Sequence, residues 1–132
     1  MARGMKERLV AKIVIVENDA DIAPLVQKLL EFEGHQAILV QEPREAAAVV
    51  WREKPDLVYL DVRLTAELDG FAILRQIRSK LDAPVLMCSG LSLEHQCLEA
   101  GANAFLLKPF DFCELMEGIN RAMANSEEVK RL

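Results

Sequence analysis

Hydrophobic and polar positions follow two patterns that take turns along the chain. Continuous apolar runs rich in Val, Leu and Ile, such as residues 13–16, are typical of strands buried on both faces. Between these runs, apolar residues recur at helical spacing, as at Ile22, Leu25, Val26 and Leu29. The patterns predict strands at 13–16, 36–40, 57–60, 84–88 and 104–107, and helices at 19–33, 43–54, 70–79, 93–100 and 111–124.

Five strand–helix units in a row predict the fold class α/β, with a doubly wound, five-stranded parallel sheet and helices on both faces. We expect one domain at residues 9–124, an N-terminal extension at 1–8, and a polar C-terminal tail at 125–132 that frays. In such sheets, ligands bind beyond the carboxyl ends of the strands. The residues that follow each strand are therefore the candidates for function.

Composition and charge narrow the class of protein. With 132 residues, 52% of them hydrophobic and 28% charged, the chain suits one globular domain. The net charge of −5 disfavours direct binding to nucleic acid, because the phosphate backbone is also negative. The apolar runs are too short to span a bilayer and no signal peptide is recognisable, so we expect a cytoplasmic protein without a membrane partner. Three cysteines without Cys-x-x-Cys spacing argue against zinc and disulfides.

Polar side chains follow four of the five predicted strands. They are Glu17, Asn18 and Asp19 after the first strand, Asp61 after the third, Ser89 after the fourth and Lys108 after the fifth. Carboxylates, a hydroxyl and an ammonium gathered at one edge of a sheet suit phosphoryl transfer onto a carboxylate nucleophile. A hard cation such as Mg²⁺ would neutralise part of the phosphoryl charge, and the lysine would pair with the phosphoryl group.

These residues lie in stretches that resemble the receiver domains of response regulators, over about residues 9–124. The matching stretches are 13–19, 57–64, 68–71, 84–90 and 99–110. Each stretch is weakly diagnostic alone, but all five occur in order and at nearly the spacing of the family. The resemblance implies a flavodoxin-like receiver fold of five β–α units, with the strand order 2-1-3-4-5.

The resemblance also implies a phosphoacceptor and a metal site. Asp61 matches the residue that accepts the phosphoryl group in the family, and it also contacts the metal. Glu17 matches the first of two acids and would bind Mg²⁺ through water, while Asn18 occupies the position of the second acid. The backbone carbonyl of Arg63 stands where the family supplies a further metal ligand.

Three more matches concern the response to phosphorylation. Ser89 matches the switch hydroxyl that closes on the phosphoryl group, and Phe105 matches the switch aromatic that rotates inward on activation. Lys108 matches the lysine that pairs with the phosphoryl group. The proline that follows, Pro109, is commonly preceded by a cis peptide bond in the family.

The sequence departs from the family pattern near the site. Asn18 replaces an acid that usually binds Mg²⁺ directly, so we expect weaker metal binding, because Mg²⁺ affinity depends on ligand charge. Thr65 stands where the family usually has Pro, and the loop at 66–68 is about one residue longer than usual. The segment 89–101 is about one helical turn short, which predicts a short fourth helix.

We therefore expect a stand-alone receiver domain that accepts a phosphoryl group on Asp61 from a sensor histidine kinase or a histidine phosphotransfer protein. The chain stops soon after the fifth helix, so its output would be contact with a downstream protein or relay of the phosphoryl group to a histidine phosphotransfer protein. A homodimer would form through the face of the fourth helix, fifth strand and fifth helix. The alternative is a pseudo-receiver, in which Asn18 has weakened metal binding and the fold acts as a phosphorylation-independent interaction module.

Enzymes of similar topology fit the sequence less well, so we expect no catalysis on a separate substrate. A haloacid-dehalogenase-type phosphatase needs a second Asp two positions after the nucleophile, and Arg63 stands there. A dinucleotide-binding enzyme needs Gly-x-Gly-x-x-Gly after the first strand, where residues 17–20 lack glycine. A flavodoxin needs a loop rich in glycine and hydroxyl groups at the same place, which is also missing.

Overall fold

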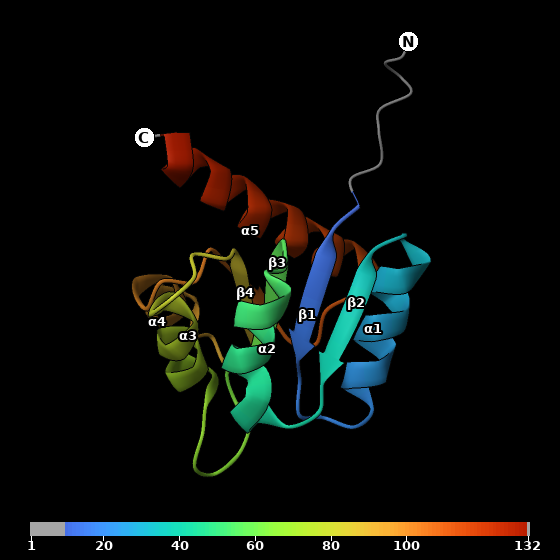
Figure 1. The fold of residues 1–132 in the computed structure, drawn as a ribbon. Coiled ribbons are helices and arrows are strands. Elements are labelled where there is room, and N and C mark those ends of the chain that lie inside the picture. Colours follow the sequence, from blue (N-terminus) through green and yellow to red (C-terminus); the bar gives the residue numbers. More distant parts are fainter. Residues whose placement is uncertain (1–9, 132) are drawn as a thin grey trace.

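Five parallel strands form the centre of the molecule. The structure is a computed structural model that describes residues 10–131. Its sheet has the order β2-β1-β3-β4-β5 (Figure 1), which confirms the predicted fold class and strand order. The strands are β1 (Lys12–Val16), β2 (Gln36–Val40), β3 (Leu57–Asp61), β4 (Val85–Ser89) and β5 (Ala104–Leu107). The predicted N-terminal extension, residues 1–8, lies outside the described residues.

Helices cover both faces of this sheet. They are α1 (Ile22–Phe32), α2 (Ala46–Glu53), α3 (Gly70–Arg78), α4 (Glu94–Glu99) and α5 (Phe112–Arg131), with a short 3-10 helix η1 (Pro43–Glu45) before α2. In Figure 1, α2 and α3 lie in front of the sheet and α5 behind it. Across residues 10–131, no helix has both the length and the apolar character needed to cross a bilayer.

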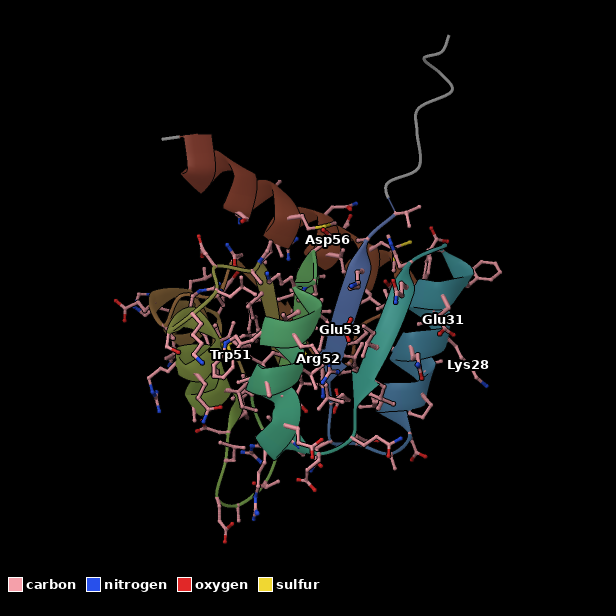
Figure 2. All side chains as sticks on the ribbon, in the orientation of Figure 1. Lys28, Glu31, Trp51, Arg52, Glu53 and Asp56 are labelled. Carbon is pink, nitrogen blue, oxygen red and sulfur yellow. The ribbon has the colours of Figure 1, made fainter. Side chains whose placement is uncertain are left out.

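Successive side chains of a strand point to opposite faces, so the sheet has two separate cores. On one face, Val14 and Val58 pack with the apolar sides of α2 and α3. On the other face, Ile15 and Tyr59 pack with those of α1 and α5. In α1, Val26 is buried as its spacing predicts, whereas Leu25 is 56% exposed; Figure 2 shows Lys28 of the same helix pointing away from the sheet.

Two predicted helix boundaries are wrong for local reasons. The first helix begins at Ile22 rather than at Asp19, because the Asp19 carboxylate accepts the backbone N–H groups of Asp21 (2.8 Å) and Ile22 (3.0 Å) and so caps the helix. The last helix continues past Ala124 to Arg131. There the side-chain amide of Asn125 donates to the backbone carbonyl of Asn103 at 2.8 Å, which anchors the segment expected to fray. The domain boundaries themselves stay predictions.

The fourth helix is short, as the sequence predicted. It has six residues and is followed by Gly101, whose φ of 111° lies in the region that favours glycine. The guanidinium of Arg78 secures this turn, because it donates to the carbonyl oxygen of Gly101 and to the side chain of Asn103, both at 3.0 Å. After this turn, β5 pairs with β4 as the last strand of the sheet.

Candidate functional site

The carboxyl ends of β1, β3 and β5 bring three charged side chains into one pocket. Glu17 follows β1, Asp61 is the last residue of β3, and Lys108 follows β5. The Lys108 ammonium lies 2.8 Å from Oε1 of Glu17 and 3.1 Å from Oδ2 of Asp61. Residues separated by as many as 91 positions in sequence therefore meet at one point. The parallel sheet explains this meeting, because all its strands end at the same edge.

Asp61 is held at the floor of this pocket by its backbone and by a neighbouring glycine. A side chain on Gly70 would place its Cβ only 2.3 Å from the Asp61 carbonyl oxygen, so only glycine lets α3 start this close to β3. The Asp61 carboxylate also accepts the backbone N–H of Arg63 at 3.4 Å. Burial and the nearby Glu17 raise the pKa of Asp61 to about 7, although Lys108 opposes the rise.

Glu17 is the most enclosed member of the site, and its side chain has no exposed surface. One carboxylate oxygen accepts from Lys108 and from the hydroxyl of Tyr59 at 3.1 Å, and the other accepts from the backbone N–H of Asp19 at 3.1 Å. Burial works against the charge of Lys108, but its bonds to Glu17 and its attraction to Asp61 raise its pKa above the ordinary value.

Tyr59 belongs to the site, although it is not among the residues predicted from the sequence. A signal was present, because the chain's single tyrosine stands two positions before Asp61 in an otherwise aliphatic strand. Residues two positions apart in a strand point to the same face. Tyr59 therefore shares the face of Asp61 and reaches the pocket from inside the core.

Asn18 makes a contact that the usual acid at this position could not make. Its side-chain NH₂ group donates to the backbone carbonyl of Leu64, and so joins the loop after β1 to the loop after β3. A carboxylate has no proton to donate and would repel that carbonyl oxygen. The amide thus connects these two loops directly.

The two predicted switch residues lie in the neighbouring strands β4 and β5. Ser89, the last residue of β4, is buried, and its hydroxyl oxygen accepts the backbone N–H of Leu91 at 3.0 Å. Phe105 in β5 is also buried and packs in the core beneath α2 and α3. The peptide bond between Lys108 and Pro109 is cis, as the resemblance implied. The switching roles of Ser89 and Phe105 stay predictions.

The donor set of the pocket suits a hard cation. Oxygen atoms of Glu17 and Asp61 and the sulfur of Cys88 lie within 4.8 Å of one another. Burial raises the pKa of the Cys88 thiol, so this sulfur stays protonated and is no ligand for Mg²⁺. Two carboxylates remain as possible ligands. Where phosphoryl oxygens complete the coordination, proteins often bind Mg²⁺ with only one or two carboxylates. The residues present therefore fit Mg²⁺, with one charge fewer than an acid at Asn18 would provide.

A doubly wound sheet with a Lys-bridged pair of carboxylates at its carboxyl edge defines a receiver-type signalling module. The family model for the response regulator receiver domain matches residues 13–120. The chain therefore belongs to the response regulator receiver domain family.

Relatives and solved structures agree with this assignment. The chain is 35% identical over 120 residues to the transcriptional regulatory protein ZraR of Salmonella typhimurium, with 88% of this chain and 27% of ZraR aligned. NtrX from Brucella abortus is similar in structure, with a TM-score of 0.84 and 31% identity over 93% of this chain and 29% of NtrX. The chain thus spans less than a third of either protein.

A third comparison concerns a protein whose structure contains a metal. The receiver domain of the sensor histidine kinase PA1611 from Pseudomonas aeruginosa was solved with a magnesium ion coordinated in its active site cleft. It has a TM-score of 0.77 and 27% identity to this chain, over 88% of this chain and 99% of that domain. Its magnesium ion is a property of that protein.

Proposed function

We propose that this chain is a phosphoacceptor module of a two-component phosphorelay, with Asp61 as the acceptor. A sensor histidine kinase or a histidine phosphotransfer protein would supply the phosphoryl group. The observation that supports the proposal best is the meeting of Asp61, Glu17 and Lys108 within hydrogen-bond distance at the carboxyl edge of the sheet. The cytoplasmic location and the stand-alone character expected from the sequence stay predictions.

The reaction follows from the chemistry of these groups. An oxygen of the Asp61 carboxylate attacks phosphorus, the bond from phosphorus to the donor histidine nitrogen breaks, and an acyl phosphate forms. Lys108 then moves from the carboxylate to a phosphoryl oxygen. The Ser89 hydroxyl donates to another phosphoryl oxygen. Phe105 would turn inward in the same transition.

Glu17, Asp61, the backbone carbonyl of Arg63 and the side-chain oxygen of Asn18 would hold Mg²⁺ in this mechanism. The cation would neutralise part of the charge on the transferred group. Before transfer, the Lys108 ammonium lies between the Glu17 and Asp61 carboxylates and neutralises part of their charge. We infer that Mg²⁺ binds this pocket weakly, since Asn18 brings no charge and its NH₂ group is already bonded to Leu64.

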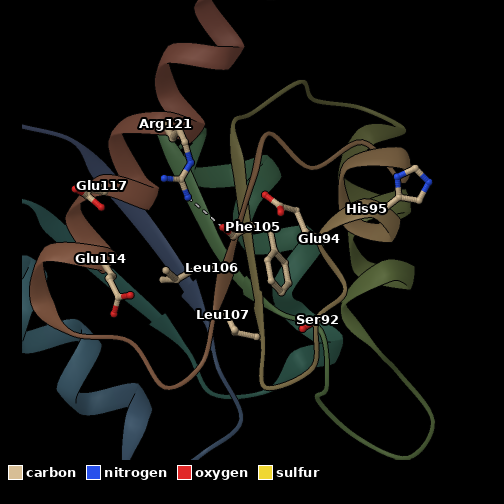
Figure 3. Close-up of a pocket in the computed structure, with 9 residues that line it drawn as sticks. All are labelled: Ser92, Glu94, His95, Phe105, Leu106, Leu107, Glu114, Glu117 and Arg121. Atoms are coloured by element: carbon tan, nitrogen blue, oxygen red, sulfur yellow. Dashed lines mark hydrogen bonds between the residues drawn. The ribbon is translucent and has the colours of Figure 1, made fainter.

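The output surface that we propose is the face formed by α4, β5 and α5. A pocket of about 380 Å³ lies on this face, lined by Phe105 and Leu107 of β5 and by Glu117 and Arg121 of α5 (Figure 3). Leu107 is 48% exposed. Arg121 donates to the backbone carbonyl of Phe105 at 3.2 Å, which links α5 to the switch position. A downstream protein or a second copy of this chain would bind here.

The second candidate function is a pseudo-receiver that interacts with its partners without phosphorylation. The bond between Asn18 and Leu64 favours it, because this bond joins the two loops without any cation.

Phosphorylation of the chain in vitro separates the two functions. The chain is incubated with acetyl phosphate and Mg²⁺, and its mass is measured before and after mild base. A base-labile gain of one phosphoryl group in the wild type, absent in Asp61→Asn, supports the phosphoacceptor. The control is Asp82→Asn, which removes an exposed carboxylate outside the pocket and should keep the gain. No gain at saturating Mg²⁺ would favour the pseudo-receiver.

A further inference from the structure

Tyr59 is a buried polar residue for which the proposed reaction has not yet accounted. It has no exposed surface, and its ring packs edge-on against Phe110 at 6.5 Å between centroids. Its main-chain neighbours across the sheet are Ile15 and Leu86, both apolar. A phenylalanine would satisfy this packing equally well. The hydroxyl group therefore needs a separate explanation.

The Tyr59 hydroxyl points at the carboxylates of the pocket and acts as a hydrogen-bond donor. It lies 3.1 Å from Oε1 of Glu17. A phenol carries its proton at neutral pH and can donate it in a hydrogen bond. Since a carboxylate can only accept, the direction of the bond is from Tyr59 to Glu17.

The bond matters most when Lys108 moves. In the structure, Lys108 and Tyr59 share one oxygen of Glu17, and the N–H of Asp19 binds the other. When the ammonium turns to a phosphoryl oxygen, Glu17 loses its strongest partner. The phenol comes from a buried strand in the core, so its hydroxyl stays beside Glu17 when the ammonium leaves. It can therefore hold the carboxylate in place throughout the transfer.

We propose that Tyr59 is a positioning residue, whose hydroxyl fixes the Glu17 carboxylate for metal binding and phosphoryl transfer. The inference rests on the proposed phosphoacceptor function. Partners that orient metal-binding groups typically change metal affinity by about 10- to 100-fold when they are removed. We expect the lower end of this range, because the N–H of Asp19 continues to hold the other oxygen of Glu17.

The first test uses Tyr59→Phe, which removes one oxygen atom and keeps the ring. The rate of phosphorylation by acetyl phosphate is measured against Mg²⁺ concentration. We expect the half-saturating Mg²⁺ concentration to rise about 10-fold, with a much smaller change in the maximal rate. The control is Ile119→Val in the same core, which should lower the unfolding temperature without moving the Mg²⁺ dependence. Equal half-saturation in wild type and Tyr59→Phe would overturn the proposal.

The second test does not depend on phosphorylation. Because the chain has one tyrosine, a ¹³C label at the phenol carbon gives a single NMR signal from Tyr59. Without metal, Glu17→Gln should shift this signal, since the bond changes from charged to neutral, whereas Glu31→Gln on the exposed side of α1 should not. An unshifted signal in Glu17→Gln excludes the bond, whatever the phosphorylation result. A shifted signal with no phosphorylation of the wild type would instead reject the proposed function alone.

Discussion

The two ends of the sheet, where the strands begin (the amino edge) and where they finish (the carboxyl edge), contain the same kinds of charged residue in different environments. At the carboxyl edge, the side chains of Lys108, Glu17 and Asp61 are only 15%, 0% and 8% exposed. At the amino edge, Lys12 lies 3.3 Å from a carboxylate oxygen of Glu53, and these side chains are 34% and 27% exposed. The distances are similar, so burial alone separates a structural surface pair from a reactive pocket.

Removing the buried ammonium should have the largest effect. In Lys108→Met, two enclosed carboxylates lose their counter-charge, so we expect the free energy of unfolding at pH 8 to fall by about 3 kcal/mol. Urea unfolding measures this loss. A loss no greater than that of Lys12→Met would show that burial does not distinguish the two edges.

Replacing Asn18 with an acid should increase the difference between the two ends of the sheet, because only the end with Glu17 and Asp61 would bind Mg²⁺ more tightly. Asn18→Asp replaces a neutral amide with a carboxylate, so we expect Mg²⁺ affinity to rise about 10-fold, measured by calorimetric titration. Without Mg²⁺ the variant should unfold at a lower temperature, because the new carboxylate faces the carbonyl of Leu64. Asn120→Asp on α5, outside the pocket, is the matched control. Unaltered Mg²⁺ affinity in Asn18→Asp would refute the role given to Asn18.

Removing the acceptor's charge should stabilise the metal-free fold at high pH. The pKa of Asp61 is about 7 in the folded chain against 3.8 as its ordinary value, so the folded state holds this proton more tightly between these pH values. Wild-type stability should therefore fall as pH rises from about 4 to 7. In EDTA at pH 8 we expect Asp61→Asn to gain about 1 kcal/mol, less than the full shift implies, because water reaches the pocket and the pair with Lys108 is lost.

The measurement for Asp61→Asn is urea unfolding of both proteins at pH 5 and pH 8. The gain should shrink at pH 5, where the wild-type carboxyl group is mostly protonated. A gain that is equal at both pH values would contradict the raised pKa.

The smallest effect should come from the partly exposed pair of Lys12 and Glu53, where the strands begin. Lys12→Met breaks an ion pair that water already screens, so we expect a change in the urea midpoint close to the experimental scatter. The comparison with Lys108→Met, made in the same buffer, is the control for the general loss of a lysine. A large loss in Lys12→Met would mean that this pair is more than a surface contact.

The sequence predicted the residues that strand direction brings together, but not the contacts that depend on how far a side chain reaches. Apolar runs locate the strands, and a parallel sheet must then gather Glu17, Asp61 and Lys108 at one edge. The bond from Tyr59 to Glu17 requires a particular rotamer across two strands, which no local pattern specifies. The partner of Asn18 depends in the same way on the path of a distant loop. The polar composition of residues 125–132 predicted that α5 would end early. The backbone carbonyl of Asn103, which holds Asn125 in place, lies 22 positions away in the sequence, so no local pattern indicates this contact.

Trp51 and Tyr59 are the only residues of their kinds in the chain, and they lie in different cores. Trp51 belongs to α2 and packs against the core on that side of the sheet, where its indole N–H donates to the carbonyl of Ile77 in α3 at 3.4 Å. Tyr59 lies between the sheet and α5. Each side of the sheet thus has its own spectroscopic reporter. Indole fluorescence and the tyrosine NMR signal can show, without any added dye, whether the two halves melt together or one before the other.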